Sequence, residues 1–135
     1  MKKLRLGIIG YGFMGQWHNN HAGTLEEVEI VAICDTDSEK RAEAPENVKL
    51  YTDYKALLAD SDVEWVMISV PNHLHHDIAI DAAKAKKNII VGGAGHTTET
   101  LRNVAGATDY FREFRLFYFV TRKDRKVWMF IWQRN

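Results

Sequence analysis

The fold of this chain is decided by the stretch Leu6-Gly7-Ile8-Ile9-Gly10-Tyr11-Gly12-Phe13-Met14-Gly15, which joins an apolar run to a glycine-rich turn. Within the pattern Gly-x-Gly-x-x-Gly, Gly10 allows a tight turn from strand to helix, and Gly12 lets the backbone approach a pyrophosphate. Gly15 lets the following helix lie close to the sheet. A helix that begins near Phe13 directs its unpaired N–H groups toward bound phosphates. The stretch therefore predicts a dinucleotide phosphate loop.

An acidic residue follows the next apolar run. The run 28–34 is followed directly by Asp35, which lies 20 residues beyond Gly15. In dinucleotide-binding domains an acid at that spacing accepts a hydrogen bond from the adenosine ribose 2′-OH. Asp35 would repel a 2′-phosphate, so we expect NAD to be preferred over NADP, with Asp37 adding to the repulsion and Thr36 softening it. Glycine turns can serve packing alone, but the order of strand, loop, helix, strand and acid favours cofactor binding.

Composition limits the class of protein. The chain has 135 residues, enough for one domain but short for a two-domain enzyme. Its 18 basic and 18 acidic residues cancel, which suggests neither nucleic acid nor a membrane as partner, and no apolar run approaches the ~20 residues of a membrane span. Cys34 is the single cysteine, and the start Met-Lys-Lys leads into a strand rather than a signal region. We expect a cytoplasmic protein and leave a homo-oligomer open.

Continuous apolar runs alternate with helical patterns along the chain. Strands that are covered on both faces are predicted at 6–9, 30–34, 65–70 and 89–91, with a short strand at 48–51. Helices are predicted at 13–23, between Ser38 and Pro45, at 52–59, and at 73–86 with Asn72 as the N-cap. This alternation predicts an α/β fold with a doubly wound parallel sheet (Rossmann) and a ligand at the carboxyl ends of its strands. A further buried strand is expected at 116–120.

Several polar residues follow the strand predicted at 65–70. Pro71 cannot continue a ladder, so the chain turns there and brings four of them near the cofactor: Asn72, His73, His75 and His76. His73 and His76 share a helical face beside Asp77, but no further ligand with metal spacing is found, so we expect no metal. Ser69 has no neighbouring base, which leaves a hydrolase triad unsupported.

The remaining histidines and the tail have plainer interpretations. His18 and His21, beside Trp17, are expected to serve packing or the surface. Residues 111–135 carry seven Lys or Arg against two Asp or Glu, so this tail has a charge of +5 and the first 110 residues have −5. Basic and aromatic residues are interleaved there, but no nucleic-acid module surrounds them, so we expect no nucleic-acid partner.

Three segments carry a resemblance: residues 4–15, Val31-Ala32-Ile33-Cys34-Asp35, and Val70-Pro71-Asn72-His73-Leu74-His75 with Ala79, Ala82, Ala83 and Lys87-Asn88-Ile89-Ile90 behind it. Together they closely resemble the glucose-fructose oxidoreductase / inositol dehydrogenase (Gfo/Idh/MocA) family. The resemblance covers about residues 4–91. Its Pro-Asn-x-x-His element is far more specific than the glycine loop alone.

This resemblance implies an N-terminal Rossmann domain that binds NAD or NADP, followed by a larger α/β domain that binds a sugar or polyol. Hydride would pass between the nicotinamide and a substrate carbon. The three loop glycines would line the pyrophosphate, Asp35 the adenosine ribose, and Pro71, Asn72 and His75 the nicotinamide side. The full set of predicted cofactor-binding residues is Gly10, Tyr11, Gly12, Phe13, Met14, Gly15, Asp35, Val70, Pro71, Asn72 and His75.

The chain also departs from this family. After the fifth strand the family carries Glu-Lys-Pro, whose lysine helps to bind substrate and cofactor, whereas this chain reads Val91-Gly92-Gly93-Ala94-Gly95-His96. We expect the family's second-domain Asp and His and its substrate domain to have no counterpart in this chain. We expect residues 1–120 to form the Rossmann domain and 121–135 an aberrant or truncated tail. With no catalytic residue assigned, the hypothesis is an incomplete sugar or polyol dehydrogenase that is inactive alone. The alternative is a non-catalytic nucleotide-sensing or protein-interaction module.

Coding arithmetic indicates an origin for these departures. With permissive codons, Ala94-Gly95-His96-Thr97 read one base later can encode Pro-Val-Thr-Leu, and Thr121-Arg122 read one base earlier can encode His-Gln. The two offsets differ, so at least two frame events are required. We interpret the sequence after Ile90 as the product of an altered reading frame rather than of selection for a new function.

Overall fold

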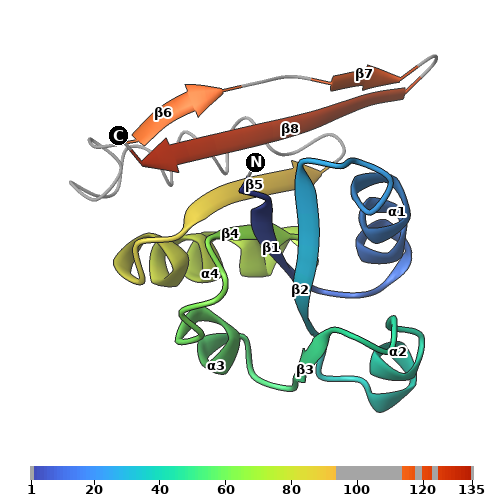
Figure 1. Cartoon of the computed structure of the whole chain (residues 1–135). Helices are drawn as coiled ribbons and strands as arrows, with labels where there is room; N and C mark the ends of the chain where they lie inside the picture. The colour runs from blue at the N-terminus through green and yellow to red at the C-terminus, as the bar shows by residue number, and fades with distance from the viewer. Residues whose placement is uncertain (1, 94–113, 118–119, 123–124, 135) are drawn as a thin grey trace.

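The computed structural model describes residues 2–93, 114–117, 120–122 and 125–134 (Figure 1). Five parallel strands form the body of the sheet in the order β3-β2-β1-β4-β5. Their bounds are β1 Leu4–Ile9, β2 Val28–Cys34, β3 Lys49–Tyr51, β4 Trp65–Ile68 and β5 Asn88–Gly93. The chain runs outward from β1 to β3 and then returns to β4 on the other side of β1, which confirms the doubly wound sheet expected from the sequence.

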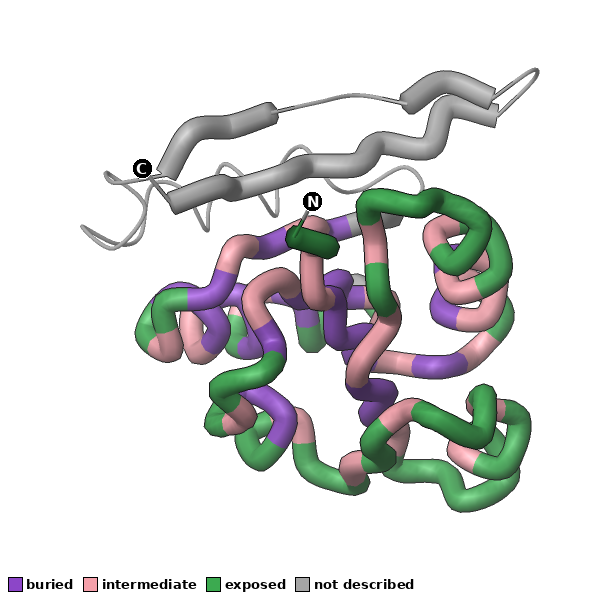
Figure 2. The backbone as a smooth tube through the Cα atoms, viewed as in Figure 1, coloured by how far each residue is buried: buried purple, intermediate pink, exposed green. Residues whose placement is uncertain are grey.

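Helices cover both faces of this sheet. They are α1 Phe13–Ala22, α2 Ser38–Ala42, α3 Tyr54–Leu58 and α4 Asn72–Lys84. Successive side chains of a strand point to opposite faces, so Ile9 joins the large core cluster formed with α3 and α4, whereas Ile8 joins a smaller one with Tyr11 and Ile33. Gly15 in α1 lies over Ile8, which places α1 on that second face. Figure 2 shows the buried residues concentrated along the central strands.

Three helix starts depend on short-range polar contacts or on proline. Asp37 and Asp53 cap α2 and α3, because each carboxylate accepts a 2.9 Å bond from the backbone N–H two residues on. Asn72 was expected to cap α4, and this expectation was wrong. Pro71 occupies the N-cap position, and Asn72 is the first helical residue. Proline is compatible with that position because its ψ, here 145°, stays extended as an N-cap residue requires, and because it has no N–H group that the helix start would leave unpaired.

Three later strands follow in the described part of the chain: β6 spans Phe114–Phe117, β7 Val120–Arg122 and β8 Arg125–Arg134. Of these, β8 runs opposite to the parallel strands, whereas β6 and β7 run in the same direction as β5. β8 pairs antiparallel with β5 and, along its length, with β6 and β7. The single strand expected at 116–120 is wrong in its bounds, because β6 begins at Phe114 and ends at Phe117, inside that range, and a second strand, β7, begins at Val120; residues 118 and 119 lie outside the described residues. A short connection such as that between β7 and β8 permits only antiparallel pairing. Among the described residues, no helix is long and apolar enough to cross a membrane.

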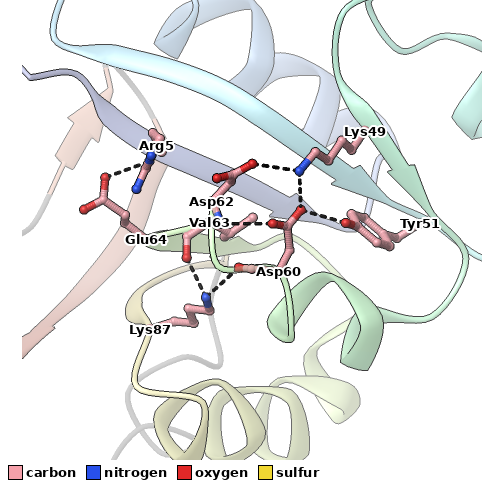
Figure 3. A network of polar contacts seen from close by, with 8 residues as sticks. All are labelled: Arg5, Lys49, Tyr51, Asp60, Asp62, Val63, Glu64 and Lys87. Atoms are coloured by element: carbon pink, nitrogen blue, oxygen red, sulfur yellow. Dashed lines mark hydrogen bonds and ion pairs between the residues drawn. The ribbon is translucent and has the colours of Figure 1, made fainter.

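A polar network ties the amino ends of the strands together (Figure 3). Lys87, which is 8% exposed, donates from Nζ to the carbonyl oxygens of Asp60 and Val63 at 2.8 and 2.6 Å. The Asp60 carboxylate accepts from Tyr51 Oη, from the backbone N–H of Asp62 and from Lys49 Nζ, and these bonds lower the pKa of Asp60 to about 2. This network lies at the edge opposite the strand ends where a ligand is expected, so we assign it a structural role.

Candidate dinucleotide-binding site

The carboxyl ends of β1, β2 and β4 are in register. Ile9 pairs with Cys34 on one side and with Ile68 on the other. The ladder continues one step past the strands, because Gly10 N donates to Cys34 O and Ser69 N donates to Ile9 O, both at 2.8 Å. The glycine turn, the end of β2 and the turn after β4 therefore meet at one edge of the sheet, as the strand pattern predicted.

The three loop glycines meet different physical demands. Gly10 has φ +93°, and a Cβ there would lie 2.6 Å from Ser69 O. A Cβ on Gly15 would collide with the carbonyl oxygen of Gly10. Both positions therefore require glycine for the fold itself. Gly12 differs, since a Cβ there would find no atom within 4 Å. The backbone at Gly12 is open, as a residue that lets a ligand approach closely should be.

The start of α1 leaves backbone donors available. Gly12 is the N-cap, and no side chain caps this helix. The first intrahelical bond runs from Gln16 N to Gly12 O at 3.0 Å, so the N–H groups of the first turn have no partner within the helix. Gln16 also donates from Nε2 to Tyr11 O at 3.1 Å, and this bond ties the glycine loop to the first turn of α1. The first turn of α1 can thus bind an anion through its free N–H groups.

Asp35 lies beside this loop with a fixed carboxylate. Its Oδ2 accepts from Tyr11 N at 2.8 Å, and its Oδ1 accepts from Asp37 N at 2.9 Å. Each carboxylate oxygen can accept a further hydrogen bond. Asp35, which the sequence spacing predicted as the ribose-binding acid, is therefore hydrogen-bonded to the glycine loop. Its carboxylate oxygens can still accept hydrogen bonds from ribose hydroxyls.

The side chains of the loop itself point in different directions. Tyr11 is 2% exposed and packs with Ile8 and Ile33, and burial, helped by the nearby Glu43, raises the pKa of its phenol. Only the backbone of Tyr11 therefore faces the edge of the sheet. Phe13 is 83% exposed and Met14 is half-buried. Their proposed cofactor contacts stay predictions.

The turn after β4 is held by a buried histidine. His75 is 3% exposed, and its Nε2 lies 2.6 Å from Val70 O. Because a carbonyl can only accept, Nε2 carries the hydrogen, while burial lowers the pKa of the ring and keeps it neutral. The buried His75 thus holds the Val70-Pro71 turn in place through its hydrogen bond to Val70 O. The ring is not exposed at the edge, so any effect on the nicotinamide would pass through Val70.

Two further features at this edge were not found from the sequence. Arg41 donates from Nη1 to the main-chain oxygen of Asp35 at 2.7 Å. Ser69 Oγ, at the end of β4, is buried with no hydrogen-bond partner among the described residues. Neither lies in the glycine motif, and the spacing of six between Asp35 and Arg41 indicates nothing by itself.

The remaining histidines have the following places. His18 is 4% exposed on the sheet side of α1, and burial, with the neighbouring His21, lowers its pKa to about 4. Trp17 stacks on His21 with ring centroids 3.9 Å apart. These positions agree with the expected packing and surface roles. His73 is exposed, and within the described part of the chain no three His, Cys, Asp or Glu residues gather as a metal site would need.

A parallel sheet of this order, with a glycine loop after β1 and an acid after β2, defines a Rossmann-type domain. Residues 4–92 match the profile of the GFO_IDH_MocA family, described as an oxidoreductase family with an NAD-binding Rossmann fold. The chain belongs to this family. That confirms the resemblance of its three segments.

The relatives show how much of a family member this chain represents. The inositol 2-dehydrogenase of Salmonella typhimurium is 37% identical over 91 residues, which make up 64% of this chain and 27% of that protein. The rhizopine catabolism protein MocA of Rhizobium meliloti is 30% identical over 114 residues, 83% of this chain and 36% of that protein. The crystal structure of an NAD-binding protein from Listeria innocua has 37% identity and a TM-score of 0.67, and the match covers 78% of this chain and 33% of that one. The chain spans about a third or less of each relative's length.

Proposed function

We propose that this chain binds a nicotinamide dinucleotide at the carboxyl edge of its parallel sheet, with NAD preferred over NADP. The observation that carries this proposal is the hydrogen bond from Tyr11 N to Asp35, which sets the acid beside the open backbone of Gly12. Backbone donors for a pyrophosphate and a carboxylate for a ribose are the two groups that the dinucleotide needs at such an edge. Family membership supports the same class of ligand.

The residues divide between the two halves of the ligand. The loop from Gly10 to Gly15 holds the pyrophosphate with its backbone, and Asp35 accepts from the adenosine ribose. The turn at Val70 and Pro71, with Asn72 and the buried His75, borders the nicotinamide. The place of the loop, of Asp35 and of the Val70-Pro71 turn at the strand ends supports these assignments, whereas those of Asn72 and His75 rest on the family resemblance. Each can be tested by substitution.

Preference for NAD rests on the charge of Asp35. Its carboxylate can accept from a 2′-OH but repels a 2′-phosphate, and the neighbouring Asp37 adds negative charge. Calorimetric titration with both dinucleotides tests this, and we expect NAD to bind more tightly. Equal or tighter binding of NADP would remove Asp35 from the assigned role.

We further propose that these 135 residues, tested by themselves, do not turn over a substrate. A bound nicotinamide supplies hydride transfer, but the reaction also needs a positioned substrate and a group that takes its hydroxyl proton. The lysine that the resemblance leads us to expect at the end of the fifth strand has no counterpart in this chain, which reads Val91-Gly92-Gly93-Ala94-Gly95-His96 there. Inositols are the first substrates to screen, because several relatives are inositol dehydrogenases.

Turnover separates this proposal from its alternatives. Saturable reduction of NAD by a polyol, lost in Gly12→Ala, would refute the inactive-domain proposal. Tight dinucleotide binding together with a partner that protects residues 114–134 from proteolysis would instead favour a nucleotide-sensing or interaction module. Binding without turnover and without such a partner is the result we expect.

A further inference from the structure

Asp35 is fixed at every polar atom it has. Its N–H donates to Tyr51 O at 3.1 Å, its Oδ2 accepts from Tyr11 N, and its Oδ1 accepts from Asp37 N. Its main-chain oxygen accepts from Arg41 Nη1 at 2.7 Å. Three of these partners are backbone groups that the fold supplies whatever the side chains are. The guanidinium of Arg41 is the one side chain among the four partners.

Arg41 closes the turn between β2 and α2 into a ring of hydrogen bonds. Its backbone N–H donates to Asp37 O at 3.1 Å, while its side chain reaches back past Asp37 to Asp35. Asp37 in turn accepts from Glu39 N. The side chain is half-buried against this turn. A charged donor on a main-chain oxygen makes a stronger bond than a neutral one, so Arg41 restrains the peptide that follows Asp35.

We propose that Arg41 is a positioning residue that sets the orientation of the Asp35 carboxylate for the ribose 2′-OH, and through it the preference for NAD over NADP. This inference rests on the proposed function. Freeing the Asp35 carbonyl would loosen the turn, and the carboxylate would then leave the direction in which it accepts from Tyr11 N and Asp37 N. The geometry of a binding site depends on the residues that hold its ligand-contacting groups in place.

The first experiment compares three variants by calorimetry with NAD and NADP. Arg41→Ala removes the donor, Arg41→Lys keeps a charged donor, and Lys40→Ala removes the same charge from the exposed neighbouring position. For Arg41→Ala we expect NAD affinity to fall roughly 5- to 10-fold, the effect of losing about one hydrogen bond, with NADP affinity nearly unchanged. Arg41→Lys should recover part of the loss, and Lys40→Ala should bind like the wild type.

The selectivity ratio distinguishes positioning from other roles. A merely structural role would lower the melting temperature without changing the NAD to NADP ratio. If Arg41 instead contacted a 2′-phosphate directly, Arg41→Ala would lower the affinity for NADP and leave the affinity for NAD unchanged. Either result would overturn the proposal.

A double-mutant cycle tests whether Arg41 acts through Asp35. In an Asp35→Ala background, Arg41→Ala should cause no further loss of NAD affinity, because the group that it positions is gone. Additive losses would show that Arg41 acts independently. If the wild type binds neither dinucleotide, both the proposed function and this inference are wrong. If the wild type binds normally but the two substitutions cause additive losses of NAD affinity, only this inference is wrong.

Amide hydrogen exchange gives a readout that needs no cofactor. The N–H groups of Tyr11 and Asp37 are bonded to the Asp35 carboxylate, so Arg41→Ala should accelerate their exchange and leave that of Ile68 in β4 unchanged. Unchanged protection at Tyr11 and Asp37 would show that the carboxylate stays in place without Arg41 and would contradict the proposal.

Discussion

The backbone N–H of Tyr11 donates a 2.8 Å hydrogen bond to Oδ2 of Asp35, across 24 positions of the sequence. This bond makes the glycine loop after β1 and the acid after β2 one unit. Because the Tyr11 side chain is buried between Ile8 and Ile33, the loop cannot shift without disturbing the core on that face. The candidate site is therefore held in shape by the sheet rather than by a ligand.

The contrast between two glycines gives a direct test of the loop. Gly12→Ala adds a methyl group to open space at φ −75°, so we expect stability to be unchanged or raised by about 0.5 kcal/mol. NAD affinity should fall at least about tenfold, because the methyl group occupies the path of the pyrophosphate. Calorimetry and thermal unfolding measure the two effects.

Gly10→Ala is the matched control for that variant. Its new Cβ would meet Ser69 O at 2.6 Å in a left-handed conformation, so we expect a loss of at least about 2 kcal/mol in the free energy of unfolding. Full NAD binding by Gly12→Ala would contradict the role of this backbone. Normal stability of Gly10→Ala would contradict the packing.

His18 should make stability depend on pH. Its pKa is about 4 in the folded chain and 6.5 when exposed, so between these values the unfolded chain binds more protons. The folded state therefore loses stability as pH falls from 6.5 to 4, by up to about 3 kcal/mol. The advantage of the wild type over His18→Gln in denaturant titrations should shrink by that amount over this window and level off below it. A difference independent of pH would refute the buried, neutral His18.

Lys87 should be a stabilising residue despite its charge. Lys87→Met removes the donor from the carbonyl oxygens of Asp60 and Val63 in a buried position, and we expect the free energy of unfolding to fall by roughly 2–3 kcal/mol. Lys55→Met, an equal change at an exposed position of α3, serves as the control. Equal effects of the two variants would mean that the network of Figure 3 contributes little.

The frame hypothesis predicts uneven protection along the sheet. If the sequence after Ile90 was not selected with the core, amides of β8 should exchange much faster than those of Ile8, Ile33 and Ile68, although β8 pairs with β5. Hydrogen exchange with mass spectrometry measures both groups at once. Equal protection would indicate that β8 is an integrated strand, and the gene sequence around codons 92–97 would then be expected to encode this chain in a single frame.

Much of the fold could be predicted because its signals are local. The continuous apolar runs place five parallel strands with small errors at their ends, and the glycine spacing with Asp35 indicates where they converge. Helix caps were readable in principle, since Asp37 and Asp53 each precede a helical segment by one residue. Asn72 was misassigned because Pro71 competes for the same position. A sequence pattern within a few residues determines such features through backbone conformation and the periodicity of side chains.

Other features depend on how strands, turns and helices pack together, even where the residues involved are near in sequence, and only the tertiary structure decided them. The burial of His75 under Val70 and the choice of Asp35 O as the acceptor for Arg41 depend on how helices pack on the sheet. So does the antiparallel pairing of β8 with β5. The sequence by itself determined a Rossmann domain with a glycine loop and an acid. The tertiary structure decided which atoms hold that acid in place, because hydrogen bonds between separate elements form only once the core has set their distance and direction.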